Sequence, residues 1–309
     1  MAKTSLSLVL PDYAVLFGNE LNRAMLPQLM KTVIAKAAFT HDSSGAYQQL
    51  MQLFSPDAPH NADLPMAALR QGSVNSLCAD PCYLHPDRDK LLLFYRDLDL
   101  GVEEANAFAH YLQPLFDEFG GRLQVQTADQ WLLQLAEPVM TQFSAKEGLH
   151  GQTVTDFLPT GDNAKNWLRL WNEIQMLLFE CPLNQAREAA GKVPINSLWF
   201  WGNGVLPQSW QSWSLVSGHH DTLQTLVSLS HSSYQPIMEH FNKASDKQLH
   251  IEPFYVDKDW QTQLEGLSAN WLIPAIKALK KWQLKELNLI VPEWGSYRLT
   301  PFSAWRCCL

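Results

Sequence analysis

Short apolar runs alternate with helical segments along the C-terminal half of the chain, and this alternation constrains the fold more than any other feature. The run Ser197–Trp201 reads SLWFW. Because it lacks polar alternation, it predicts a strand buried on both faces of a parallel sheet. Leu249–Val256 and Leu287–Val291 predict two further strands. Strands that alternate with helices are typical of an open, mostly parallel α/β sheet with helices on both faces.

The N-terminal half adds one strand to this sheet and a separate block. Ser5–Leu10 predicts a buried strand that Pro11 stops. Residues 73–140 contain a strand, a helix from Val102 to Phe119, and two more strands, including Trp131–Leu135. We therefore expect residues 1–72 to begin the α/β core, 73–140 to form an inserted α+β domain, and 141–309 to complete the core. Further predicted helices cover residues 19–38, 45–54, 219–242 and 260–282, and a short edge strand is expected at Tyr297–Leu299.

Composition narrows the range of partners. The chain is 46% apolar and 17% charged, too apolar for a disordered protein. Its 23 basic and 31 acidic residues give a net charge of −8, without a basic run that would indicate nucleic-acid binding. No apolar stretch is long enough to span a bilayer, and the five cysteines are sparse and odd in number. We expect a cytoplasmic protein with reduced thiols and neither a nucleic-acid nor a membrane partner.

Three acidic residues follow predicted strands, where open α/β sheets bind ligands. Asp12, Asp257 and Glu293 could meet at one sheet edge as a divalent-metal site, or lie apart as solvated loop acids. The run Ser217–Asp221 contains Ser, His and Asp side by side. Because triad residues normally come from separate loops, this run does not predict a triad.

The most distinctive stretch is Trp167–Gly204, where amide and charged residues stand in an aromatic setting. One interpretation is a preformed pocket in which Arg187 anchors an anion. The other is a core segment whose amide side chains bond to local backbone. The sequence leaves both open.

Part of this stretch resembles a known family. Residues 184–204 carry Asn184, Arg187 and Gly191, followed by Pro-x-Asn-Ser-Leu-Trp-x-Trp-Gly-x-Gly. This pattern resembles the cofactor-independent phosphoglycerate mutases, especially the archaeal type, which belong to the alkaline phosphatase superfamily. Ala79–Tyr83 and the strand–helix–strand block after it resemble that family's inserted substrate-side domain. A group of bacterial mutase-like or regulatory proteins is similar over most of the chain.

The resemblance implies an alkaline-phosphatase-like α/β fold with an inserted domain and a small phosphorylated or anionic ligand. In active mutases two divalent metal ions, Mn or Zn, lie at the strand ends, where this chain offers Asp12, Asp257 and Glu293. The first strand here ends in Pro11-Asp12 instead of Asp-Gly, and the late strand ends in Pro292-Glu293-Trp294 without an Asp-His pair. The positions that match the family's pattern, and that the resemblance implies bind substrate, are Asn184, Arg187, Asn196, Trp199, Gly202 and Gly204.

These departures lead to two hypotheses. The first is a mutase-like protein with an eroded metal site and no metal cofactor, which binds a ligand or a protein partner and has a regulatory role. The alternative is an active metal-dependent phosphoglycerate mutase, or a related phosphatase acting on a small phosphorylated acid.

Overall fold

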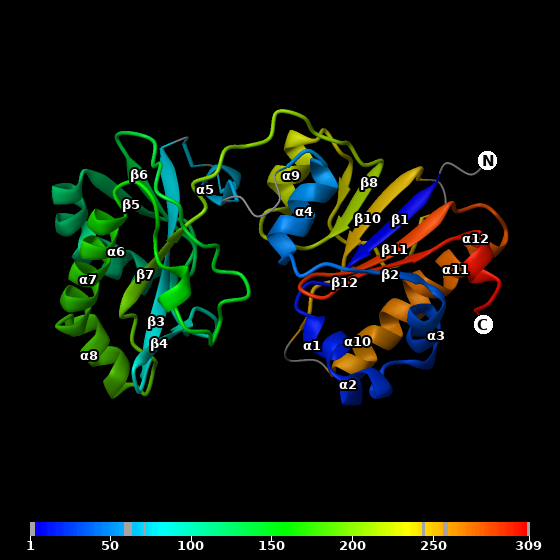
Figure 1. Ribbon diagram of the computed structural model, residues 1–309, viewed down its shortest axis with the longest axis horizontal. Helices are drawn as coiled ribbons and strands as arrows, with labels where there is room; N and C mark the ends of the chain where they lie inside the picture. Colours follow the sequence, from blue (N-terminus) through cyan, green and yellow to red (C-terminus); the bar gives the residue numbers. More distant parts are fainter. Residues whose placement is uncertain are drawn as a thin grey trace. The chain divides into compact units, whose positions relative to one another are not determined.

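The chain folds into two units, which are described separately (Figure 1). The computed structural model describes residues 4–58, 64–70, 72–73, 75–242, 245–255 and 259–307. Unit 1 consists of Met1–Ala58 and Pro207–Leu309, and unit 2 of Pro59–Leu206. Unit 2 extends on both sides beyond the inserted block expected at residues 73–140.

Unit 1 is built on a seven-stranded sheet with β1 near its centre. β1 runs parallel to β10 on one side and to β11 on the other. The parallel strands continue through β8 to β9, while β12 and β2 are antiparallel additions next to β11. In sheet order the strands are β2 (Ala38–His41), β12 (Gly295–Leu299), β11 (Glu286–Val291), β1 (Ser5–Val9), β10 (Lys247–Ile251), β8 (Leu215–Gly218) and β9 (Tyr234–Gln235).

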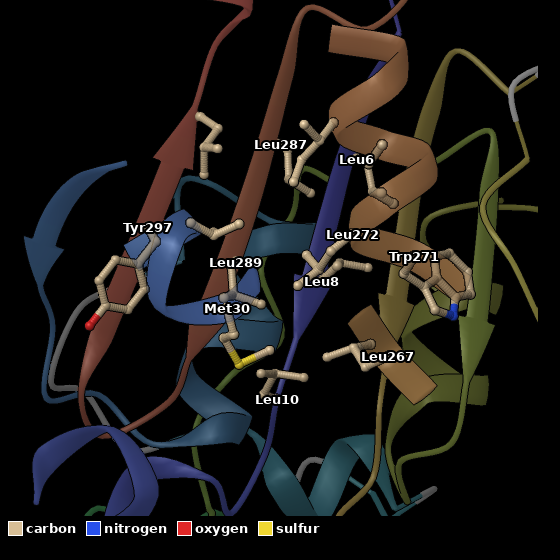
Figure 2. Packing of buried hydrophobic residues seen from close by; sticks show 14 of the residues in the cluster. Leu6, Leu8, Leu10, Met30, Leu267, Trp271, Leu272, Leu287, Leu289 and Tyr297 are labelled. Atoms are coloured by element: carbon tan, nitrogen blue, oxygen red, sulfur yellow. The ribbon is translucent and has the colours of Figure 1, made fainter. Parts of the chain in front are cut away.

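Helices cover both faces of this sheet, as expected. One face carries α3, α10 and α11, and the other carries α4 and α9 (Figure 1). Leu6 and Leu8 of β1 pack with Leu287 and Leu289 of β11, and Met30 of α3 joins the same cluster near Leu289 (Figure 2). The helices of unit 1 are α1 (Ala14–Gly18), α2 (Glu20–Met25), α3 (Gln28–Lys36), α4 (Ala46–Phe54), α9 (Leu223–Leu229), α10 (Trp260–Leu267), α11 (Ile273–Lys280) and α12 (Pro301–Ala304), with a π-helical turn at Ser268–Leu272.

The mostly parallel α/β class is therefore confirmed, but three local predictions for unit 1 are wrong. The helix expected over residues 19–38 is divided into α2 and α3, because Pro27 disfavours helical backbone at Leu26, and the chain is already extended in β2 from Ala38. The helix expected over residues 219–242 is limited to α9, because the apolar periodicity stops at Leu229 and a serine-rich turn follows. The chain then forms β9 beside β8. Tyr297–Leu299 does not form an edge strand, because β2 pairs with the outer side of β12.

Unit 2 contains an antiparallel sheet organised by one long strand, β3 (Ser76–Asp87). Its partners are β4 (Lys90–Phe94), β6 (Trp131–Leu135) and β7 (Ser197–Trp201), and β5 (Gly121–Val125) pairs with β6. The prediction that Ser197–Trp201 joins the parallel sheet is wrong, because β7 is antiparallel to β3. A fully apolar run indicates burial on both faces, and burial does not specify strand direction.

Tryptophan residues form much of the core of unit 2. α6, α7 and α8 lie along one face of its sheet (Figure 1). Trp167 of α7 packs at ring-centroid distances of 4.9, 5.1 and 5.1 Å against Phe119, Phe143 and Phe200. The helices of unit 2 are α5 (Met66–Leu69), α6 (Val102–Phe119), α7 (Ala164–Phe179) and α8 (Pro182–Ala189), with a 3₁₀ turn at Thr155–Phe157. In the part of the chain that the structure describes, no helix is both long and apolar enough to cross a membrane.

A buried carboxylate joins several elements of unit 2. Asp80 of β3 forms ion pairs of 2.7 Å with Arg70 and of 2.7 Å with Lys146. It also accepts hydrogen bonds from the Trp201 ring nitrogen (2.9 Å) and from the backbone of Trp131 (3.1 Å). Burial alone would raise the pKa of Asp80, but the two cations outweigh it and lower the pKa from 3.8 to about 2.

Replacing Asp80 is expected to destabilise unit 2 strongly. Asp80→Asn leaves two buried cations without their counter-charge, which costs about 3–5 kcal/mol of unfolding free energy at neutral pH. Because the folded pKa lies below the unfolded value, the carboxylate contributes fully above about pH 4 and loses its contribution as the pH falls towards 2. Urea unfolding between pH 7 and pH 2 measures both effects.

Asp87→Asn is the matched control, because Asp87 is exposed at the end of the same strand. An Asp80→Asn variant as stable at pH 7 as this control would contradict the role given to the buried carboxylate.

Candidate functional site

A pocket lies at the carboxyl end of β10 in unit 1, where the α/β architecture favours ligand binding. Its volume is about 710 Å³. Residues 238–240, the segment after β10, α10 and the π-helical turn line it. Polar side chains such as Glu252, Gln263 and Asn270 share this lining with Trp271.

A buried histidine is fixed directly behind the pocket. His250 of β10 stacks on the Trp271 ring, with 3.8 Å between ring centroids and 14° between planes. Its Nδ1 lies 2.9 Å from the Ser217 hydroxyl of β8, and its Nε2 lies 3.0 Å from a carboxylate oxygen of Glu252. Ser217 and His250 face each other because they are paired in the β8–β10 register. Packing and two polar contacts therefore hold the imidazole in one orientation.

Ser217, His250 and Glu252 form a chain of hydrogen bonds that leaves no serine hydroxyl exposed to the pocket. A carboxylate only accepts hydrogen bonds, so Nε2–H donates to Glu252, and in the neutral imidazole Nδ1 then accepts from the Ser217 hydroxyl. Ser217 is completely buried, whereas the Glu252 side chain is 23% exposed and lines the pocket. Ser217 and His250 therefore orient the carboxylate of Glu252, the member of the set that reaches the pocket.

This arrangement was not predicted from the sequence, although the sequence carries a signal for it. The polar residues Gln248, His250 and Glu252 stand at every second position. Residues two apart along a strand share a face. The Ser, His and Asp of the run Ser217–Asp221 are neighbours in the sequence only. The histidine that contacts Ser217 belongs to the adjacent strand.

Tyr13 adds a hydroxyl beside the pocket. It lies within 3.4 Å of the Gln263 side-chain oxygen and 3.5 Å of the Pro253 carbonyl. Burial, followed by the nearby charge of Glu252, raises the pKa of Tyr13 well above its ordinary value. The hydroxyl stays protonated at neutral pH and acts as a hydrogen-bond donor.

The charged lining of the pocket is mainly acidic. Glu239, Glu252 and Asp259 contribute carboxylates, and His240 contributes an imidazole. Asp259 already caps α10, because its carboxylate accepts hydrogen bonds from the backbone and hydroxyl of Thr262 at 2.8 and 2.9 Å. Among the described lining residues, the pocket therefore presents more negative than positive groups.

Two of the three residues predicted to bind metal, Asp12 and Glu293, lie at the same edge of the sheet, in separate turns. Asp12 follows β1 and Glu293 follows the neighbouring β11, and both are exposed with left-handed backbone φ values of 66° and 65°. Asp257 lies outside the described residues. Within the described ranges, no group of three His, Cys, Asp or Glu side chains is arranged to hold a metal ion. The described residues therefore do not fit a two-metal site.

An aromatic cluster stands immediately after Glu293. The Trp294 ring nitrogen donates to the Tyr297 hydroxyl at 2.8 Å, and the ring packs 5.8 Å from the Phe39 ring centroid. The Arg23 guanidinium lies 5.7 Å from the Trp294 ring centroid. The turn after β11 is therefore stabilised by packing of Trp294.

The predicted substrate residues lie in unit 2. The Arg187 guanidinium is buried and donates to the carbonyls of Val193 (2.8 Å), Asp99 (3.3 Å) and Leu98, and to Glu104 (2.8 Å). These contacts attach α8 to the start of α6. An anion would have to displace Glu104 to reach Arg187.

The other predicted substrate residues also make structural contacts. Asn184 bonds to the Leu178 carbonyl and to both backbone groups of Ile195, and Asn196 bonds to both backbone groups of Leu84. Trp199 donates its ring N–H to the Ser144 carbonyl at 2.9 Å.

Two glycines complete this predicted set. A Cβ on Gly202 would lie 2.8 Å from the Met66 Cβ, and its φ is +78°, so both space and backbone require glycine. Gly204 is half-buried two residues later. The six residues thus belong to the scaffold of unit 2, and their role in binding substrate stays a prediction.

Comparison with curated proteins finds similarity over a short stretch. No family model matches the chain. A probable 2,3-bisphosphoglycerate-independent phosphoglycerate mutase of Geobacter sulfurreducens is 38% identical over 60 residues, covering 19% of this chain and 15% of the relative. The Methanothrix thermoacetophila 2,3-bisphosphoglycerate-independent phosphoglycerate mutase is 37% identical over 57 residues, covering 18% and 14%. The aligned stretch thus spans less than a sixth of either relative.

Two solved structures align over most of the chain with TM-scores below 0.5. The cofactor-independent phosphoglycerate mutase of Thermoplasma acidophilum has a TM-score of 0.41 at 13% identity, covering 96% of this chain and 89% of that one. The PH0037 protein of Pyrococcus horikoshii has a TM-score of 0.46 at 11% identity, covering 96% and 87%. On the two curated matches, this chain resembles the 2,3-bisphosphoglycerate-independent phosphoglycerate mutases over part of its length.

Proposed function

We propose that this chain is a phosphoglycerate-mutase-like protein that binds a small ligand without catalysing the mutase reaction, and that it has a regulatory role. The proposal rests on the acidic residues that follow the strands of the parallel sheet. Asp12 and Glu293 occupy separate exposed turns, and the described residues provide no set of metal ligands. A mutase of this type needs metal ions to activate its nucleophile and to stabilise the charge that develops.

The pocket beyond β10 supports the ligand-binding part of the proposal. It combines the polar groups of Glu252, Gln263 and Asn270 with the Trp271 ring, which is typical of a small-molecule site. His250 holds Glu252 in place, so little side-chain ordering is needed when a ligand binds. The acidic lining favours a ligand that presents hydroxyl groups to Glu252 and directs its phosphate away from the carboxylates.

The alternative is an active metal-dependent mutase or phosphatase that acts on a small phosphorylated acid. It is supported by the partial similarity to curated mutases. On that alternative, Asp12, Asp257 and Glu293 are the candidate ligands for two divalent ions.

A turnover assay separates the two proposals. Purified full-length protein is incubated with 3-phosphoglycerate and Mn²⁺, Zn²⁺ or Mg²⁺, and 2-phosphoglycerate is measured with a coupled enolase reaction. We expect no conversion above that of a protein-free control, and no stoichiometric metal by elemental analysis. Metal-dependent turnover that Asp12→Ala abolishes would establish the alternative.

Thermal unfolding tests where the ligand binds. We expect 3-phosphoglycerate, at about ten times its dissociation constant, to raise the melting temperature by about 3 °C. Glu252→Gln should enlarge this shift, because one fewer negative charge faces the ligand while the amide oxygen still accepts from His250. Glu265→Gln is the control, since Glu265 is exposed on α10 and does not line the pocket.

A Glu252→Gln shift equal to that of the control would place the ligand elsewhere. The complete lack of a shift in the native protein would contradict the binding of this phosphorylated acid and favour the form of the proposal in which the partner is a protein.

A further inference from the structure

Three large aromatic side chains project from unit 1 near α12. Trp282, Phe302 and Trp305 are 53%, 75% and 64% exposed, and we call them the aromatic patch. The rings of Trp282 and Phe302 contact edge to face, with 5.1 Å between centroids. Phe302 and Trp305 are three residues apart along a helical turn and therefore share a face. Large aromatic side chains that are exposed next to one another mark a surface that contacts a protein, a membrane or a ligand.

The backbone conformation of Trp282 supports a functional role for its exposed side chain. α11 ends in a motif in which Trp282 N–H donates to the Leu279 carbonyl and Gln283 N–H donates to the Ala278 carbonyl, both at 2.9 Å. Trp282 occupies the left-handed position of that motif, with φ of 56°, where glycine is the usual residue. A bulky, half-exposed side chain is therefore held in a conformation that disfavours it. Such strain is characteristic of functional positions.

The two chain segments that carry the aromatic patch are basic, and Glu286, which follows the first of them, is paired with Arg298. The segments 273–285 and 301–307, which carry the three aromatic residues, contain no Asp or Glu. Lys280 donates to the Cys307 carbonyl at 2.7 Å, which joins the end of α11 to the segment after α12. The basic residues of the two segments are Lys277, Lys280, Lys281, Lys285 and Arg306, in a chain whose net charge is −8.

We propose that the aromatic patch and its surrounding cations bind the surface of an anionic lipid bilayer. Tryptophan rings favour the headgroup level, where their apolar body and polar N–H are both accommodated. Lysine and arginine beside them are attracted to the negative leaflet. Aromatic groups next to cations are the composition of peripheral membrane-binding segments. This surface site departs from the expectation that the protein has no membrane partner.

Co-sedimentation with vesicles tests the proposal on the full chain. Vesicles of phosphatidylcholine with about 30% phosphatidylglycerol should bind at least about tenfold more tightly than pure phosphatidylcholine. Binding should weaken as the salt concentration rises to about 0.5 M. The double variants Trp282→Ala/Trp305→Ala and Lys281→Glu/Arg306→Glu should each lose at least about tenfold in affinity.

Matched controls come from unit 2. Phe179→Ala removes an aromatic side chain that is 85% exposed, and Arg122→Glu/Lys165→Glu reverses two exposed cations. Both should bind vesicles like the native chain. Trp282→Gly should also weaken binding, yet melt no lower than the Trp282→Ala variant, because glycine relieves the left-handed backbone. This variant separates loss of binding from loss of folding.

Equal binding to both kinds of vesicle, or patch variants that bind like the unit 2 controls, would overturn the proposal. Failure to bind either vesicle, together with self-association in solution that the patch variants abolish, would assign the surface to a protein partner instead.

Discussion

The parallel pairing of β1 with both β10 and β11 is the constraint on which unit 1 depends. β1 is buried along almost its whole length, so it can only be the middle of a sheet covered on both faces. Parallel pairing directs the three carboxyl ends to one edge. The turn with Asp12, the segment with Glu252 and the turn with Glu293 therefore all lie at that edge. Which of these acidic residues forms a site then depends on the side chains packed behind each.

The three strand ends differ in what lies behind them. Behind Glu252, His250 is fixed by Trp271 and Ser217, and a pocket opens in front. After Glu293 the chain enters the aromatic cluster of Trp294, and Asp12 is exposed in a left-handed turn. A pocket with a preorganised carboxylate suits recognition of a ligand. This is the physical basis for proposing that the protein retains binding without the mutase chemistry.

The residues that carry the resemblance in residues 184–204 illustrate why similarity and activity can separate. Asn184, Asn196 and Arg187 satisfy buried backbone groups, and Gly202 fits where a side chain would collide. Buried polar groups without partners are costly, so substitution at these positions destabilises the fold whether or not the protein is an enzyme. Packing in unit 2 therefore requires these residue types, and their role in binding substrate stays a prediction. Asp80 likewise contributes to the packing of unit 2, because it pairs with the buried Arg70 and Lys146.

The sequence by itself determined the local elements with clear periodicity and the α/β class. It predicted the strand at β1 and the helix α6 to the residue, because these depend on near neighbours in the chain. The direction of β7, the β9 pairing after the shortened α9 and the contact of Ser217 with His250 were decided only by tertiary structure. Each depends on partners distant in sequence. Burial of an apolar run does not encode strand direction, and residue type does not encode which side chain on the adjacent strand it will meet.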